Sequence, residues 1–187
     1  MVLASGSGTL FQALIDAPER GSVFEISGLV TDQPSAAAIG RAAQAGIPIA
    51  VIALGDYESR ADWNSAMADA IATYEPDLVV SAGFMRVLAE PVLSRFAGRI
   101  INTHPALLPA FPGAHAVRDA LAAGATESGS TVHFIDAGVD TGPVITQEAV
   151  AVFPGDDEAS LHERIKIVER RLLVDVVLDL SHTLGKN

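Results

Sequence analysis

The chain has 187 residues, of which 49% are hydrophobic and 5% aromatic, so it is long enough to bury the core of one domain. Its formal net charge of −11 argues against a protein that grips a nucleic-acid backbone, which needs clustered Lys and Arg. The absence of cysteine excludes disulfides, thiolate metal sites and a cysteine nucleophile. With no apolar run near the ~20 residues that cross a bilayer and no signal-peptide pattern, we expect a cytoplasmic protein without membrane contact.

Short apolar runs alternate with helical patterns along the first hundred residues. We expect strands at residues 1–4, 24–31, 47–54 and 78–82 and from residue 100 onward, and helices at residues 10–17, 36–45 and 60–74 with a short one after Pro91. Strands that alternate with helices in this way are typical of a parallel sheet.

The pattern changes in the C-terminal part of the chain. After a helix at residues 115–123, two strands at residues 130–135 and 144–152 have only a turn between them, so we expect an antiparallel pair at one edge of the sheet. Residues 158–180 are predicted to form a long amphipathic helix, with an apolar face made by Leu161, Ile165, Val168, Leu172 and Val176. The prediction is therefore one α/β domain over residues 1–187, with a Rossmann-like, mostly parallel sheet flanked by helices.

A small-residue loop, Ser-Gly-Ser-Gly-Thr at residues 5–9, joins the first strand to the first helix. Its glycines allow a sharp bend, and the free amides at the start of the helix favour an anion, with hydroxyl donors from Ser7 and Thr9. The loop is not a P-loop, because no Lys-Ser/Thr follows the second glycine, and it lacks the third glycine of a dinucleotide fingerprint. The alternative is an ordinary strand–helix turn with a cap.

The strand that begins at residue 100 runs into Asn102 and His104. Two residues apart on a strand, these side chains project to the same side. Prolines at positions 105, 109 and 112 then stiffen the loop, at the edge where open parallel sheets bind ligands. An amide beside an imidazole suggests chemistry on a carbonyl; the alternatives are a turn-forming Asn and a His that bonds the backbone.

A carboxylate follows in the loop Gly-Val-Asp-Thr-Gly, at Asp140. It could hold the ring of His104 in one orientation and favour its protonated form, or it could simply be a turn residue. Asp136 is the competing carboxylate, but it directly follows strand residues and is expected to start the turn.

The other histidines carry weaker predictions. His133 lies within a strand and is expected to be structural or a supporting partner, and His115 is expected to start a helix. His162 and His182 fall on the last helix and look incidental. Because no two histidines have metal-ligand spacing, we expect no metal.

The segment Gly-Phe-Met-Arg-Val-Leu, at residues 83–88, follows an apolar strand. An apolar loop with one arginine at this edge of the sheet could line a pocket for a flat ring system. Ordinary core packing with a surface arginine is the alternative.

Two of these patterns together, Asn102-x-His104-Pro-x-Leu-Leu-Pro109 and Asp140-x-Gly-Pro143, resemble the 10-formyltetrahydrofolate formyltransferases, and the resemblance covers nearly the whole chain. It implies transfer of the formyl group of 10-formyltetrahydrofolate, a cosubstrate, to the amine of N1-(5-phospho-D-ribosyl)glycinamide in de novo purine (IMP) synthesis. We expect small-molecule partners, no nucleic acid and no metal, and a protein that is a monomer or a homodimer.

The resemblance assigns site residues by position. The catalytic ones are Asn102, His104 and Asp140. Those for the phosphate and glycinamide of the substrate are Gly6, Ser7, Gly8, Thr9 and Glu169. Those for the folate are Arg60, Met85, Arg86, Val87, Leu88 and Asn102. The implied organisation is a phosphate-binding half at residues 1–99 and a catalytic, folate-binding half at residues 100–187.

Other activities are weighed against this one. Methionyl-tRNA formyltransferases need an additional RNA-binding domain, for which the length and the acidic charge leave no room. A formyltetrahydrofolate deformylase usually has an extra N-terminal domain, and its water nucleophile would leave the phosphate loop without a purpose. A noncatalytic nucleotide-phosphate binding module of Rossmann type is the alternative from another class.

Overall fold

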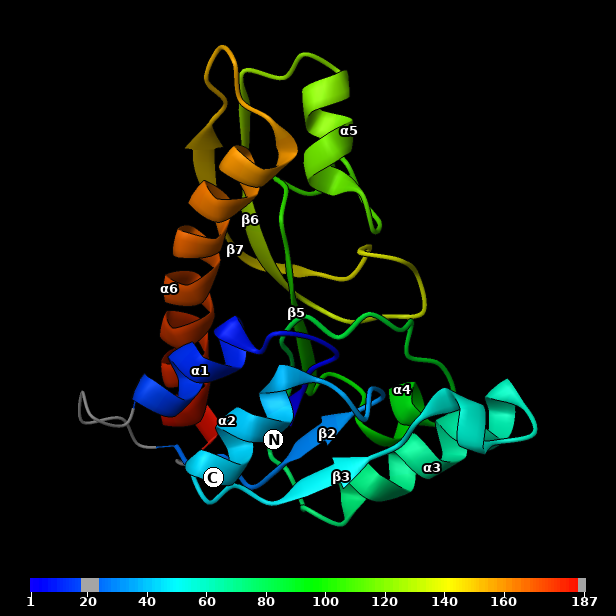
Figure 1. Cartoon of the computed structure of the whole chain (residues 1–187). Helices are drawn as coiled ribbons and strands as arrows, with labels where there is room; N and C mark the ends of the chain where they lie inside the picture. Colours follow the sequence, from blue (N-terminus) through cyan, green and yellow to red (C-terminus); the bar gives the residue numbers. More distant parts are fainter. Residues whose placement is uncertain (18–23, 185–187) are drawn as a thin grey trace.

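The computed structural model describes residues 1–17 and 24–184 (Figure 1). Its strands are β1 (Val2–Leu3), β2 (Leu29–Thr31), β3 (Ile49–Val51), β4 (Val79–Ser81), β5 (Ile100–His104), β6 (Glu127–Phe134) and β7 (Val144–Ala151). In the described part of the chain they form one seven-stranded sheet in the order β3-β2-β1-β4-β5-β6-β7. The first five run parallel, whereas β6 pairs antiparallel with β5 and β7. The predicted parallel sheet with an antiparallel edge is confirmed.

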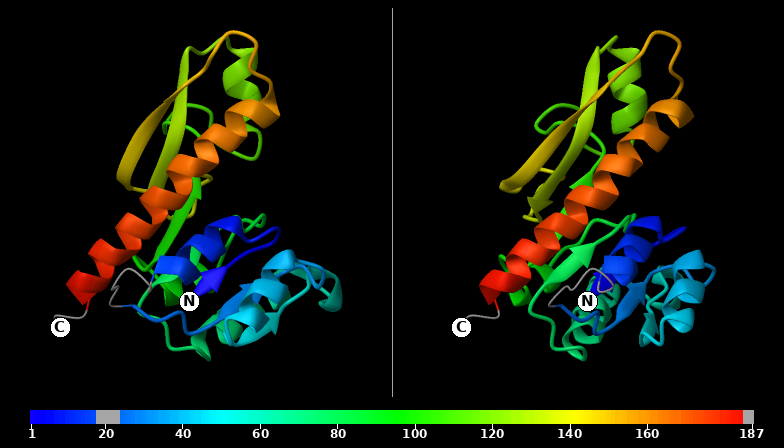
Figure 2. Two further views of the ribbon diagram at one scale, coloured as in Figure 1. Left: turned by 60° about the vertical axis from the view of Figure 1, so that its left-hand side comes forward. Right: turned by 90° about the vertical axis from the view of Figure 1, so that its left-hand side faces the viewer.

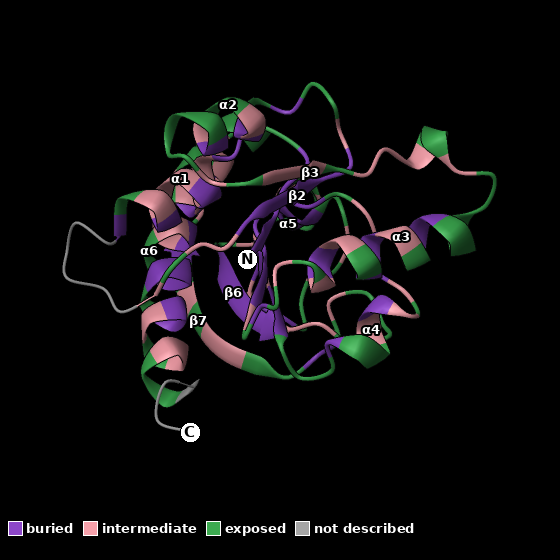
Figure 3. Cartoon of the chain, turned by 90° about the horizontal axis from the view of Figure 1, so that it is seen from below, coloured by how far each residue is buried: buried purple, intermediate pink, exposed green. Residues whose placement is uncertain are grey.

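Helices cover both faces of the sheet. They are α1 (Thr9–Asp16), α2 (Ala37–Gln44), α3 (Arg60–Ala72), α4 (Val92–Arg95), α5 (Ala116–Ala122) and α6 (Glu158–Leu184), with a 3-10 helix η2 (Leu54–Asp56) before α3. Side chains of α1, α2 and α6 pack on one face, and those of α3 and α4 pack on the other. The alternation along β1 produces both layers, because Val2 packs with the first set and Leu3 with the second. Figure 3 shows the buried residues on the strands and on the inner sides of the helices.

The long helix α6 runs past most of the molecule, from the region of α5 and the β6–β7 pair to the region of α1 (Figure 2). Four residues of its predicted apolar face are buried, and the fifth, Val168, is half-buried and packs against two core clusters. None of the helices in the described residues is long and apolar enough to span a membrane.

Three predicted strands have other limits in the structure. The strand expected at residues 24–31 is regular only over β2, although Phe24 and Ile26 still pack against the core. The one expected at residues 47–54 is reduced to β3, with η2 after it, and β6 starts three residues earlier than predicted. Hydrophobicity reports burial, but backbone pairing with a neighbour decides where a strand begins and ends.

The sheet order determines where the loops meet. In this sheet β1, β4 and β5 are neighbours and run parallel, so the segments that follow them leave the same edge side by side. These segments are the loop at residues 5–9, the segment at residues 83–88 and the loop after His104. Ligands of open α/β sheets bind at this edge.

Candidate active site

A cavity of about 590 Å³ opens where β1, β4 and β5 end. Its lining comes from the loops after these strands, from the β6–β7 loop and from one face of α6. The predicted site residues that line it are Gly6, Ser7, Gly8, Thr9, Met85, Arg86, Val87, Leu88, Asn102, His104, Asp140 and Glu169. Arg60 is the predicted site residue that lies outside this lining.

Oxygen atoms face both ring nitrogens of His104, which is 4% exposed. Nδ1 lies 3.3 Å from Oδ2 of Asp140, and Nε2 donates to the backbone oxygen of Phe111 over 2.7 Å. The same carboxylate oxygen accepts a hydrogen bond of 2.8 Å from the backbone nitrogen of Gly113. An imidazole donates from one nitrogen when neutral and from both when protonated, so this arrangement suits a ring that acts as a proton donor.

His133 joins the same carboxylate to Asn102. Its Nδ1 donates to the backbone oxygen of Phe134 over 2.9 Å, which leaves Nε2 to face the site. Nε2 lies 3.3 Å from Nδ2 of Asn102 and 3.6 Å from Oδ1 of Asp140. The register of the sheet brings this about, because Asn102 on β5 is the partner of His133 on β6. Residue 133 therefore lies beside two of the predicted catalytic side chains, where it could have the supporting role considered for it from the sequence.

Asp140 is kept ionised by its neighbours. The contact with the His133 ring is the main cause that holds the pKa of Asp140 below its usual range, burial acts in the opposite direction, and the hydrogen bond from Gly113 lowers the pKa further. Asp136 accepts a hydrogen bond of 3.0 Å from the backbone nitrogen of Gly138, so it organises the turn, as predicted.

The loop at residues 5–9 has a backbone shape that requires glycine at residue 8. Gly8 has a φ of +68°, and a Cβ there would lie 2.9 Å from the Cβ of Ala38 on α2. Helix α1 begins at Thr9, and among the described residues no side chain caps its first turn and no acidic residue lies in that turn. The first turn of α1 thus lacks the side-chain cap considered for it from the sequence, and amides without such a cap suit an anion.

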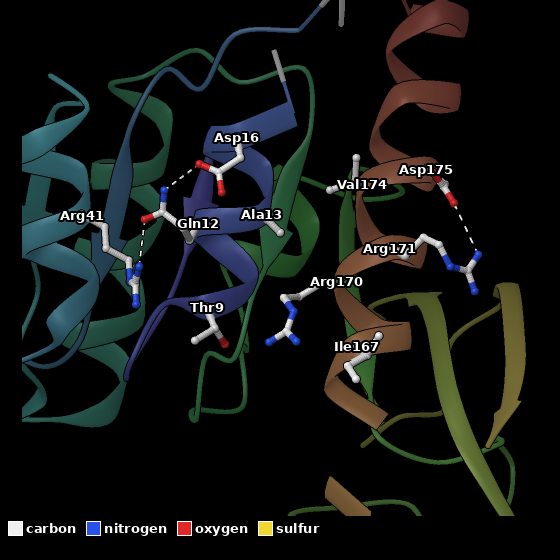
Figure 4. A pocket seen from close by; sticks show the side chains of 10 residues that line it. All are labelled: Thr9, Gln12, Ala13, Asp16, Arg41, Ile167, Arg170, Arg171, Val174 and Asp175. Carbon is white, nitrogen blue, oxygen red and sulfur yellow. Dashed lines mark hydrogen bonds and ion pairs between the residues drawn. The ribbon is translucent and has the colours of Figure 1, made fainter. Parts of the chain in front are cut away.

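A second cavity, of about 540 Å³, lies on the other side of Thr9 between α1 and α6 (Figure 4). Arg41 of α2 reaches its edge, where Nε donates to the backbone oxygen of Ser7 over 2.8 Å and Nη1 to Oε1 of Gln12 over 2.9 Å. Arg170 points from α6 into the space between the two helices (Figure 4). Two guanidinium groups thus line this second cavity near the start of α1.

Exposed apolar side chains also line the first cavity. Met85 and Val87 are 71% and 57% exposed, and Val139 of the β6–β7 loop is a third exposed apolar residue in the lining. Exposed apolar side chains that share one cavity are typical of a ligand site. Arg60 lies just outside, where its guanidinium stacks 4.3 Å from the ring centre of Trp63 and donates to the backbone oxygen of Val87.

One face of α6 closes the cavity with His162, Lys166 and Glu169. Glu169 is 5% exposed, and burial raises its pKa although a hydrogen bond with Thr103 opposes the rise. His162, which the sequence analysis expected to be incidental, lines the cavity, and so does Lys166, for which the sequence analysis made no prediction. Their spacing of four and three residues on one helix face was the available signal. Within the described residues, no group of His, Asp and Glu side chains could hold a metal ion.

Comparison with known proteins identifies the family of this fold and cavity. The family model described as formyl transferase matches residues 1–177 of the chain. The chain belongs to the formyl transferase family. Phosphoribosylglycinamide formyltransferase of Mycobacterium tuberculosis is 52% identical to this formyl transferase over 181 residues, which cover 97% of this chain and 84% of that protein.

Solved structures and a larger enzyme agree with the family. The crystal structure of glycinamide ribonucleotide transformylase 1 from Symbiobacterium toebii matches with a TM-score of 0.94 and 40% identity, over 97% of this chain and 86% of that one. The human trifunctional purine biosynthetic protein adenosine-3 is 39% identical over 190 residues, which cover 100% of this chain and 19% of the human protein. The fold predicted for this formyl transferase from its sequence is therefore also that of its relatives.

Proposed function

We propose that this formyl transferase moves the formyl group of 10-formyltetrahydrofolate to the amine of N1-(5-phospho-D-ribosyl)glycinamide, giving the N-formyl product and tetrahydrofolate in de novo purine (IMP) biosynthesis. The observation that carries the proposal is a single cavity that holds a phosphate loop, an apolar ring site and a His–Asp pair. Relatives named phosphoribosylglycinamide formyltransferase support the same reaction. The cytoplasmic location and the monomeric or homodimeric state stay predictions.

The reaction forms one carbon–nitrogen bond and breaks another. The substrate amine attacks the formyl carbon, which becomes tetrahedral with a negatively charged oxygen. The bond from this carbon to N10 of the folate then breaks, and a proton lost by the amine ends on N10. The amide nitrogen of Asn102 and the ring of His104 supply hydrogen-bond donors for the developing oxygen charge, as in an oxyanion hole.

His104 and Asp140 handle the proton. The hydrogen on Nε2 that now binds the Phe111 oxygen is the one the ring can donate, so a substrate oxygen takes the place of the Phe111 oxygen when the ring acts. Asp140 stays ionised, keeps the ring in one orientation and balances its charge when it is protonated. We assign to the same carboxylate the ordering of a water that relays protons from the amine toward N10.

The two substrates lie at opposite ends of the cavity. The amides of Gly8 and Thr9 and the nearby hydroxyls bind the phosphate ester, and Glu169 binds the glycinamide substrate from α6. The segment at residues 85–88 takes the flat ring of the folate, and Arg60, tied to Val87, receives the carboxylates of its glutamate tail.

A spectroscopic assay for loss of 10-formyltetrahydrofolate, with the glycinamide substrate present and absent, tests the proposal. We expect loss only when that substrate is present, and poor turnover of the analogue without the phosphate ester. Loss without the amine would indicate a deformylase. Binding of inorganic phosphate by calorimetry without any folate turnover would indicate a noncatalytic binding module.

A further inference from the structure

Asp32, which directly follows β2, is a buried carboxylate outside the lining of the cavity. Its side chain has no exposed surface. Oδ1 accepts a hydrogen bond of 2.5 Å from the hydroxyl of Ser5, and Oδ2 accepts bonds of 2.8 Å from Nε of Arg86 and 3.0 Å from Nε2 of Gln33. Because a buried carboxylate is unfavourable without donors, these contacts are obligatory for the fold around it.

Two of these donors belong to the two substrate loops. Ser5 begins the phosphate loop, and Arg86 belongs to the predicted folate segment. Ser5 also ties the loops to each other, since its backbone nitrogen donates to the oxygen of Gly83 over 3.1 Å and its hydroxyl accepts a bond of 2.9 Å from the backbone nitrogen of Met85. A chain of hydrogen bonds thus runs from Met85 through Ser5 to Asp32, and such chains strengthen one another.

The sheet topology brings the three segments together. β2, β1 and β4 are neighbours in the sheet, and Asp32, Ser5 and the folate segment follow their ends. Burial would raise the pKa of Asp32, but hydrogen bonds from Ser5, Arg86 and Gln33 together hold it below its usual range. The carboxylate is therefore charged at neutral pH and forms an ion pair with Arg86.

We propose that Asp32 is a positioning residue that holds the phosphate loop and the folate segment in register, so that one buried carboxylate sets the affinity for both substrates. This inference rests on the proposed function of the two loops. Asp32 reaches the substrates only through Ser5 and Arg86, and no substrate atom needs to touch it. Its removal should therefore weaken binding at two places at once, which loss of a residue within one subsite would not do.

Steady-state kinetics of Asp32→Ala, with each substrate varied in turn, test the inference. We expect the KM values for the glycinamide substrate and for 10-formyltetrahydrofolate to rise together, each by about tenfold, with a smaller change in kcat. The amide of Asp32→Asn can still form one hydrogen bond with Ser5 and one with Arg86. Both KM values of this variant should therefore lie between those of Asp32→Ala and those of the wild-type protein. Arg86→Gln removes the contact of Asp32 with the folate segment but not the one with Ser5, so it should raise mainly the KM for the folate.

Asp69→Ala is the matched control, because Asp69 forms an exposed ion pair with Arg95 over 2.6 Å and should leave both KM values unchanged. If Asp32→Ala does not fold, Asp32→Asn decides the matter, and unchanged KM values in that variant would overturn the inference. Unchanged Kd values for both substrates in a folded Asp32→Ala protein would do the same while leaving the proposed function intact. Failure of the wild-type protein to bind either substrate in calorimetry would overturn both.

Discussion

Four polar side chains at the centre of the cavity hold one another in place. Asp140 lies between the rings of His104 and His133, and His133 in turn contacts the amide of Asn102. Three of these side chains are predicted to act on the substrates, whereas His133 lines the cavity and contacts Asn102, Asp140 and the backbone oxygen of Phe134. We predict on this basis that the alignment of Asn102 and Asp140 depends on the ring of His133.

Replacing that ring tests this dependence. We expect His133→Ala to lower kcat by about 10- to 100-fold with a smaller effect on KM, because Asn102 and Asp140 lose the contact that aligns them. His133→Gln should recover part of the loss, and His182→Ala, at an exposed position of α6, is the control with an unchanged rate. Initial rates measured over a range of substrate concentrations separate kcat from KM. A change in KM alone would contradict the positioning role.

At the scale of elements, the turn from β1 into α1 is shaped by its contact with α2. The positive φ of Gly8 and the approach of Ala38 leave no room for a side chain, and Arg41 holds the oxygen of Ser7 from the same helix. The amides of α1 can therefore present a fixed site to a phosphate only while α2 stays packed against the loop.

Gly8→Ala is expected to raise the KM for the glycinamide substrate by at least tenfold, because the added methyl group and the strained φ displace the amides. Gly40→Ala is the matched control, since a Cβ there meets open space within α2 and should stabilise the helix by up to about 1 kcal/mol. Kinetics with varied glycinamide substrate and thermal unfolding of both variants give the comparison. Equal KM values for the two variants would rule out a phosphate site at this turn.

Helix α6 carries a buried acid into the wall of the cavity. Because burial holds the pKa of Glu169 above its usual value, the folded protein keeps the proton more tightly than the unfolded chain. The resulting contribution to the free energy of unfolding is complete below the ordinary Glu pKa and is lost as the pH rises through the raised value.

Glu169→Gln should therefore gain stability relative to the wild-type protein as the pH rises from about 4 to 8. Urea unfolding at several pH values measures the difference. Glu163→Gln, on the exposed side of the same helix with a carboxylate bonded to Lys166, should show no such gain. If the difference in the free energy of unfolding between Glu169→Gln and wild type does not change with pH, the pKa of Glu169 is not raised in the folded protein.

At the scale of the whole molecule, one sheet runs through both predicted halves of the chain. The two halves meet where β4 pairs with β5, and α6 packs on strands of the second half and on α1 of the first. We propose on this basis that residues 1–187 act as one domain, with the cavity at the junction of the halves. Both substrates then meet at the ends of strands of one sheet.

Much of this architecture follows from the sequence. The alternation of apolar runs and helical patterns predicts the parallel sheet, and the two adjacent strands after residue 123 predict its antiparallel edge. The polar residues at strand ends, Asn102 and His104, predict the edge that holds the cavity. These features are visible because they depend on local periodicity and on residue type.

Other contacts of the site depend on which strands are neighbours in the sheet. No local pattern in the sequence indicates this strand order. The sequence analysis makes no prediction for Asp32, whose role depends on β2, β1 and β4 lying side by side and on Arg86, 54 residues away along the chain. Arg41 and Arg170 likewise come to the same cavity from α2 and α6. A lone histidine on a long helix, such as His162, has no local pattern that points to the cavity that it lines.

The most direct test of the account compares wild-type protein with His104→Ala and Asn102→Ala in the same assay for loss of 10-formyltetrahydrofolate, with the glycinamide substrate saturating. The account predicts rapid loss with wild type only when the amine is present, and turnover lower by about 10²- to 10³-fold in each variant with both substrates still bound, since each variant lacks one donor to the oxygen charge. Near-normal turnover in either variant would contradict it.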